Sequence, residues 1–199
     1  MSNGISTLAT PLSQRLKAGT HDVHEGVDRS IMSAASFASM ERYGEFLAVQ
    51  YLFHRDVDAL YGHATLQALL PDLVERRRLS LVEADLADLG LTPPTTETQP
   101  VFIAGTEPDL PTALGWLYVA EGSNMGAALL RKEAAKLGLS DEQGARHLAP
   151  APIRPAAHWR AFTAGLDAAA LTEEEEARAV AGAQAAFARV QAHVDERLG

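Results

Sequence analysis

The sequence predicts an all-α fold in which the 199 residues form a single domain. Apolar residues recur three or four positions apart through most of the chain, a period typical of amphipathic helices. Strand patterns with a period of two are scarce, and helix-start and helix-stop residues bracket the periodic segments. A chain of this length is expected to fold as one domain, with residues 1–10 as a flexible N-terminal tail.

Proline, glycine and capping residues set the expected helix boundaries. Pro71 and Pro111 suit the first turn of a helix, whereas Gly90 and Gly138 suit the residue that follows the last turn. Capping boxes begin at Ser140 and at Thr172. We therefore expect seven or eight helices, the clearest of which cover residues 12–30, 41–61, 71–90, 111–137, 140–143 (short), 159–166 and the region after 172, with loops at 92–108 and around Pro150, Pro152 and Pro155.

Composition excludes several classes of function. The net charge is -9, which disfavours nonspecific binding to nucleic acid. There is no cysteine, so disulfides, iron–sulfur clusters and thiolate haem ligands are excluded. The N-terminus lacks the basic and apolar regions of a signal peptide, and no apolar run is long enough to span a membrane. We expect a cytoplasmic protein.

Two histidines in the first helix differ in their position around the helix axis. If Leu12 is set at zero, the apolar stripe that includes Leu16, Val23 and Val27 centres near about 30°. His24 then lies at about 120°, on the shoulder of that stripe, and His21 lies at about 180° and points to water. A shoulder imidazole is well placed to ligate a flat apolar cofactor packed on the helix. The alternative is a half-buried histidine that only hydrogen-bonds a neighbour.

Lys17 lies two turns before His24 and about 20° away from it around the axis. The separation along the axis, roughly 10 Å, is close to that between a haem iron and its propionates. Lys17 is therefore a candidate partner for a propionate. A solvated surface lysine is the alternative.

Three glycines lie inside the helix expected at residues 111–137. Each interior glycine costs roughly 1 kcal/mol relative to alanine, so Gly115, Gly122 and Gly126 need an explanation. They share one face, where they leave bare backbone for close approach. Either another helix or a planar ligand can lie against that backbone, and the pattern alone leaves both open.

Two segments resemble the bacterial haem oxygenase family. The segment GWLYVAEGSNMGAALLRKEAAKLGLSDEQGARHL (residues 115–148) is similar to the family's distal-helix region, and LKAGTHDVHEGVD (residues 16–28) is similar to its proximal-helix signature. RYGEFLAVQYLFHRDVDALY and LTEEEEARAVAGAQAAF are also family-like, so the resemblance covers nearly the whole chain. It implies a haem sandwiched between a proximal and a distal helix.

The resemblance also implies roles for individual residues. The histidine that matches His24 ligates iron, and Gly122 and Gly126 allow the distal helix to approach the haem. No aspartate stands between these glycines, unlike in mammalian-type enzymes, which leaves Ser123 and Asn124 as candidates to hold a distal water. Other candidate haem-binding residues are Lys17, Tyr118, Lys132 and Arg178. In the family, cleavage at the α-meso carbon goes with a basic residue at the position of Lys17 and a tyrosine at that of Tyr118. The neutral Met32 also favours this cleavage position.

The implied reaction is the oxidative cleavage of haem b, which is both cofactor and substrate, to biliverdin IXα, carbon monoxide and iron. O2 is consumed, and because the chain has no dinucleotide fingerprint, electrons must come from a separate ferredoxin or reductase. A bilin acceptor such as a bacterial phytochrome is a further partner that the resemblance suggests.

Other functions remain as alternatives. A haem carrier or sensor without catalysis would have the same ligand and pocket. A non-haem di-iron oxidase would need Glu-x-x-His pairs, and no glutamate stands three residues before any of the seven histidines. A thiaminase-like enzyme would need a cysteine nucleophile, which the chain lacks.

Overall fold

The all-α prediction is confirmed. The computed structural model describes residues 10–150 and 155–199, so the expected tail lies outside the described residues except for Thr10, as does Pro152. None of the described helices is long and apolar enough to cross a membrane. The elements in chain order are α1 (Leu12–Ser33), α2 (Met40–Tyr61), α3 (Ala64–Leu69), the 3-10 helix η1 (Val74–Arg76), α4 (Leu79–Asp88), α5 (Leu110–Lys136), the 3-10 helix η2 (Arg146–Leu148), α6 (Pro155–Ala168) and α7 (Glu173–Leu198).

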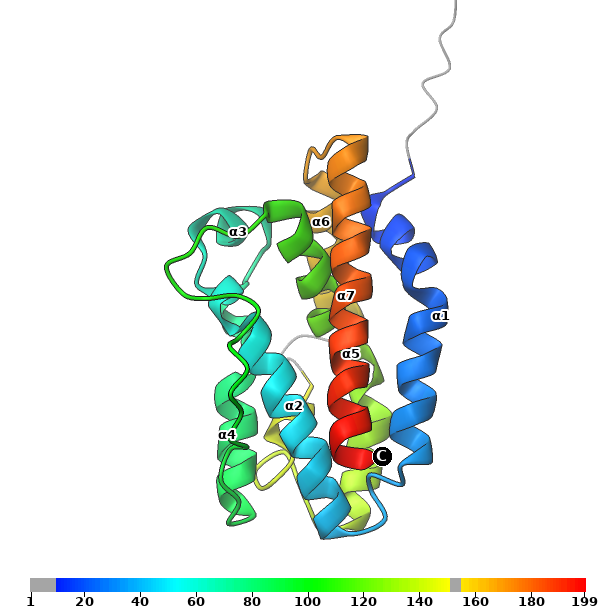
Figure 1. The fold of residues 1–199 in the computed structure, drawn as a ribbon, viewed down its shortest axis with the longest axis vertical. Helices are drawn as coiled ribbons and strands as arrows, with labels where there is room; N and C mark the ends of the chain where they lie inside the picture. Colours follow the sequence, from blue (N-terminus) through cyan, green and yellow to red (C-terminus); the bar gives the residue numbers. More distant parts are fainter. Residues whose placement is uncertain (1–9, 151–154) are drawn as a thin grey trace, which may run out of the picture.

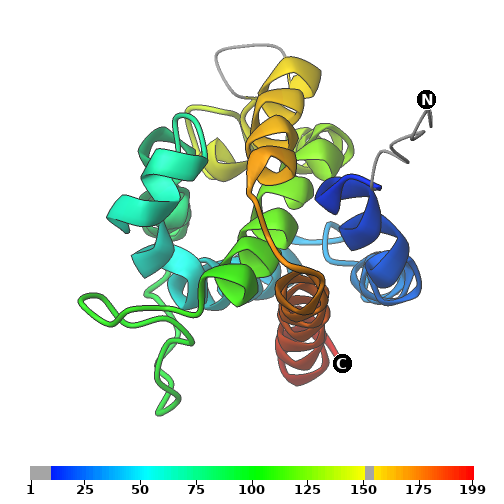
Figure 2. The same ribbon diagram turned by 90° about the horizontal axis from the view of Figure 1, so that it is seen from above.

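The helix α5 lies at the centre of the molecule. Figure 1 shows α1, α2, α5 and α7 running along the long axis, with α4 against α2 at one edge. In the view from above, α5 is surrounded by α1, α2, α6 and α7, all of which it contacts (Figure 2). The contact with α7 is the most extensive. Any ligand between α1 and α5 is therefore held by helices that the rest of the bundle supports.

Two apolar clusters stabilise this arrangement. The larger joins α1, α2, α5, α6 and α7, and the smaller joins α2, α4 and the second half of α5. Burial of such side chains contributes roughly 25 cal/mol per Å2 of apolar surface. Fully buried members of the two clusters include Leu16, Val49, Leu114, Leu117, Phe162, Leu166, Tyr43, Phe46, Leu47 and Val82.

The ends of the long helices follow the local signals. The Asp109 carboxylate accepts a hydrogen bond from the Thr112 amide at 3.1 Å, which caps the start of α5. Thr172 and Glu175 form the expected capping box at the start of α7. Gly138 follows α5 with a φ of +82°, a left-handed conformation that glycine adopts without strain.

The predicted helix from Pro71 to Gly90 is wrong in its first half. That region holds a turn, η1 and α4, while α3 precedes Pro71. Asp72 has a φ of +54°, which interrupts a helix, and Arg76 Nε donates to the Pro71 carbonyl at 3.0 Å. The turn brings the Arg76 guanidinium into the interior, where it pairs with Glu121.

The short helix expected at residues 140–143 is also wrong. Ser140 and Gln143 form an antiparallel bridge, with reciprocal backbone hydrogen bonds of 2.9 and 3.1 Å. The Ser140 hydroxyl accepts from the Glu142 amide, as in a serine turn, instead of capping a helix. The Tyr43 hydroxyl of α2 donates to the carbonyl of Gly144 at 2.7 Å, so tertiary contacts hold this turn in place.

Smaller differences concern α1 and α6. Pro155, assigned to the loop, begins α6, where the absent amide costs nothing. Val23, expected on the buried stripe of α1, is 40% exposed. Thr20 is buried in the stripe instead, and its hydroxyl donates to the Leu16 carbonyl at 2.7 Å, which satisfies the buried polar group.

Glycines allow the backbones of α5 and α7 to touch. A Cβ added at Gly115 would lie 2.0 Å from the carbonyl oxygen of Ala179, and one at Gly182 would lie 2.6 Å from that of Thr112. These distances are far shorter than a van der Waals contact. Close packing of α5 against α7 therefore explains why residue 115 is a glycine. Helix packing is one of the two alternatives that the sequence left open.

We expect Gly115→Ala to lower the free energy of unfolding by at least about 2 kcal/mol, because the methyl group would force the two helices apart. Gly26→Ala is the matched control, since a Cβ at Gly26 meets nothing within 4 Å. That change should stabilise the protein by roughly 0.5–1 kcal/mol. Chemical denaturation of both variants measures the difference, and equal stability of the two would contradict direct backbone packing at Gly115.

Candidate functional site

A cavity of about 520 Å3 lies between α1 and α5. This volume falls within the roughly 300–1,000 Å3 of small-molecule sites. Side chains of α2, α7 and η2 complete its walls. The structure brings together on this cavity most of the residues that the sequence singled out: Lys17, His21, His24, Met32, Tyr118, Gly122, Ser123, Asn124 and Gly126.

His24 presents an accessible imidazole on the α1 wall. Its side chain is 57% exposed, and its ring centroid lies 5.3 Å from that of Phe187 in α7. Its Nε2 atom lies 3.4 Å from a carboxylate oxygen of Asp28, one turn later. An imidazole is a common axial ligand of haem iron, so an accessible histidine on this wall suits that role. Within residues 10–150 and 155–199, no three His, Asp or Glu side chains gather closely enough to hold a metal ion.

His21 is the more exposed of the two histidines, at 64% of its side chain. Its Nε2 atom lies 3.4 Å from Glu25, and the residue borders the cavity as well. The exposure agrees with its expected direction toward water. Of the two histidines, it is His24 whose ring packs against Phe187. Thus His24 is the histidine packed against an aromatic wall of the cavity.

The α5 wall is open where the glycines lie. A Cβ at Gly126 would meet nothing within 4 Å, and one at Gly122 would lie 3.6 Å from the ring of Trp159. Both glycines line the cavity, whereas Gly115 does not. The Ser123 hydroxyl donates to the Ala120 carbonyl at 2.7 Å, so it is turned back to its own helix. The three glycines therefore serve two purposes, helix packing at one end and an open wall at the other.

Lys17, Tyr118 and Asn124 reach the cavity from the two facing helices. The ring centroid of Tyr118 lies 5.5 Å from that of Trp159, and burial raises the pKa of its hydroxyl. The phenol therefore stays protonated and is a hydrogen-bond donor at physiological pH. Lysine and tyrosine donors at a cavity wall suit an anionic group of a ligand.

Lys132 and Arg178, also expected to bind the cofactor, are not among the residues that line the cavity. Arg178 lies nine residues before Phe187, which places it about half a turn around α7 and roughly 13 Å along it. Its guanidinium pairs with Asp109 at 3.3 Å instead. Lys132 is an exposed residue beyond the part of α5 that borders the cavity. The contacts of these two residues lend no support to a role in haem binding, which stays a prediction.

Sequence reasoning missed a polar side of the cavity, formed by His54, Arg78 and His147. Both histidines are buried, and burial first, then the electrostatic effects of His147 and Arg78, lowers the pKa of His54 to about 3. One signal was available, since His54 interrupts the apolar face of α2 next to Phe53. Arg78 directly precedes α4, and His147 lies in the 3-10 helix η2. Neither position belongs to a periodic pattern from which the sequence could predict a cavity residue.

A buried ion pair between Glu121 of α5 and Arg76 of η1 fixes the position of the α5 wall. Glu121, next to Gly122, accepts hydrogen bonds of 3.0 Å from both Arg76 and the Tyr61 hydroxyl. Burial raises the pKa of Glu121, while Arg76 and Tyr61 oppose the shift. Because a buried charge without its partner is costly, this pair strongly favours one position of α5 over α2 and η1.

Comparison with known proteins identifies the family of this chain. The family model described as Heme oxygenase matches residues 10–196. The chain is also 42% identical over 184 residues to heme oxygenase PigA of Pseudomonas aeruginosa, an alignment that covers 92% of this chain and 91% of that protein.

The chain belongs to the haem oxygenase family.

Members of this family are enzymes that degrade haem. Solved structures of haem oxygenases are similar as well. That of the NO- and CO-bound haem oxygenase from Neisseria meningitidis has a TM-score of 0.89 and 44% identity, and covers 96% of this chain and 94% of its own. Haem oxygenase 2 from Chlamydomonas reinhardtii, without haem, shares the fold at 16% identity, with a TM-score of 0.73 over 94% of this chain and 98% of its own.

We expect Gly126→Leu to fold normally but to reduce haem binding, because the new side chain projects into open space on the cavity wall. Titration of haem into the purified variant, followed by absorbance, measures the loss. Gly26→Leu is the control, since its Cβ also meets nothing but it does not line the cavity. Equal haem affinity and turnover in the two variants would show that Gly126 is not near the ligand.

Proposed function

We propose that this chain is a haem oxygenase that binds haem b between α1 and α5, with His24 as the iron ligand. The observation that carries the proposal is the cavity itself, which has an accessible imidazole on one wall and the uncovered backbone at Gly126 on the other. A flat apolar molecule that needs one protein ligand for its metal suits this arrangement. Haem is the substrate.

The chemistry of ring cleavage belongs to haem, which with O2 and donated electrons gives biliverdin, carbon monoxide and iron. In this proposal the chain binds haem and orients it. His24 holds one face, while Gly122 and Gly126 let the backbone of α5 approach the other. A neutral imidazole supplies less electron density than a thiolate, which suits attack on the ring in place of O–O cleavage.

The electron donor in this proposal is a separate ferredoxin or reductase. The chain has no cysteine to hold an iron–sulfur cluster and no glycine-rich fingerprint for a dinucleotide. A bilin-binding protein such as a bacterial phytochrome is the proposed acceptor of the product. Reconstitution with purified donors and chromophore-free acceptors tests each partner.

We expect His24→Ala to lose the absorption and resonance Raman signature of a haem with histidine ligation, and to lose turnover. His21→Ala should keep both, because His21 is the more exposed and it is the ring of His24 that packs against Phe187. The two variants remove the same group one turn apart, so each controls for the other. If His21→Ala loses the signature and His24→Ala keeps it, the assignment is wrong.

Cleavage is expected at the α-meso carbon. Lys17 and Tyr118 line the cavity from opposite helices, and hydrogen bonds from both to the propionates would fix the rotation of the ring. Chromatography of the biliverdin isomers after turnover measures the outcome.

The double variant Lys17→Asn, Tyr118→Phe should lose α selectivity while it still binds haem, because His24 is unchanged. A β or δ isomer as the main product of the unmodified protein would contradict this expectation.

A further inference from the structure

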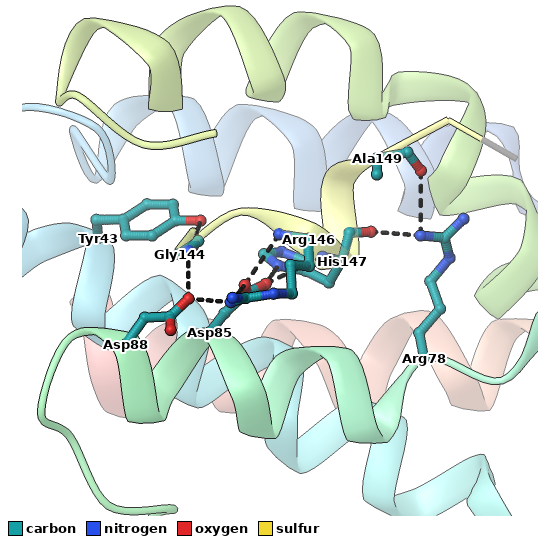
Figure 3. Close-up of polar contacts among 8 residues, drawn as sticks. All are labelled: Tyr43, Arg78, Asp85, Asp88, Gly144, Arg146, His147 and Ala149. Atoms are coloured by element: carbon teal, nitrogen blue, oxygen red, sulfur yellow. Dashed lines mark hydrogen bonds and ion pairs between the residues drawn. The ribbon is translucent and has the colours of Figure 1, made fainter. Parts of the chain in front are cut away.

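Two carboxylates at the end of α4 hold the segment that leads into η2 (Figure 3). Asp88 accepts hydrogen bonds from the Gly144 amide, at 2.8 Å, and from the Arg146 guanidinium. Asp85 is fully buried and accepts from the Arg146 amide at 2.9 Å. The two acids thus bind the same segment, but only Asp85 reaches further, to His147.

Asp85 contacts His147 twice with one oxygen. Its Oδ2 atom accepts from the His147 amide at 3.0 Å and lies 2.8 Å from Nδ1 of the ring. A carboxylate can only accept, so Nδ1 carries the hydrogen. Burial would raise the pKa of Asp85, but the hydrogen bonds from His147 and Arg146 outweigh it and lower the pKa. The acid is therefore ionised.

Burial keeps the imidazole of His147 neutral despite its contact with Asp85. Burial lowers its pKa, and the opposing effect of Asp85 does not overcome this. With Nδ1 protonated, Nε2 of a neutral ring is a hydrogen-bond acceptor. This is the arrangement by which a carboxylate commonly sets the tautomer and orientation of a functional histidine.

Nε2 of His147 is buried and finds no hydrogen-bond partner in the part of the chain that the structure describes. His147 lines the cavity, as do Arg78 and His54, whose Nε and Nδ1 atoms respectively are equally without partners among those residues. Buried polar atoms are rarely left unsatisfied, and a polar site with several partners is where ordered water binds. Arg78 also donates to the His147 carbonyl at 2.6 Å, so donor and acceptor are tied together.

We propose that Asp85 is a positioning residue for haem cleavage: it holds His147 so that Nε2 accepts a hydrogen bond from a water molecule on the polar side of the haem cavity. The role in cleavage rests on the proposed function, whereas the orientation of His147 does not. Reduction of O2 consumes protons, and a water held between Nε2 and the donors of Arg78 would relay them, giving one proton toward O2 and regaining one from solvent water.

The orientation is tested without haem. In the haem-free protein, long-range 15N NMR of the His147 ring should show Nδ1 protonated and Nε2 bare, unchanged between pH 6 and 8. Asp85→Asn should lower the Nδ1–H population, because an amide oxygen accepts more weakly than a carboxylate and the NH2 end, where it faces the ring, can only donate to Nδ1. A proton on Nε2 in the unmodified protein, or an unchanged tautomer in Asp85→Asn, overturns the proposal.

The role in catalysis is tested against Asp88→Asn, which loosens the same segment without touching His147. Both variants should bind haem with unchanged affinity. Asp85→Asn should form roughly tenfold less biliverdin per O2 consumed, by analogy with the loss when a metal-ligating histidine is deprived of its carboxylate partner, and Asp88→Asn should not. Equal losses in both variants would mean that Asp85 only supports the segment, which overturns the proposal.

Failure of the proposed function is a separate result. If the unmodified protein binds haem but forms no biliverdin, that function fails. The NMR measurement still decides whether Asp85 orients His147.

Discussion

The direct contact between the backbones of α5 and α7 is the constraint on which the rest of the structure depends. Gly115 and Gly182 bring the helices so close that even a methyl group would overlap a carbonyl oxygen. This contact places α5 at the centre of the bundle. Because α7 also packs along α1, it sets how far α1 stands from α5, and so the width of the cavity.

Charged residues inside the bundle reinforce this geometry at two levels. Arg76 and Glu121 pair behind the α5 wall, and Asp56 pairs with Arg189 at 2.7 Å to join α2 and α7. Each buried acid has a cationic partner, which offsets the cost of removing it from water. Such pairs add directionality that apolar packing lacks, since a small shift of α5 would leave a charge unpaired.

The cavity has two chemically different sides. On α1 and α5, accessible His24, Lys17 and Tyr118 frame an open backbone, where a planar ligand can be ligated and its anionic groups paired. On the α2 and η2 side, buried histidines and Arg78 form a polar surface in an otherwise apolar space. A haem oxygenase needs both, because it must bind an apolar macrocycle and also bring protons to O2.

The sequence by itself determined the helical fold, most helix boundaries and the two helices that face the cavity. Those features follow from local signals, namely the 3.6-residue period, caps such as Thr172 with Glu175, and glycines that need a reason. Tertiary structure decided which other polar side chains reach the cavity. It turned Arg178 toward Asp109, broke the helix after Pro71 so that Arg76 pairs with Glu121, and folded residues 140–149 so that His147 meets Asp85. These pairings join residues between 45 and 69 positions apart. They depend on how helices pack against one another, and no pattern within a single helix encodes that distance.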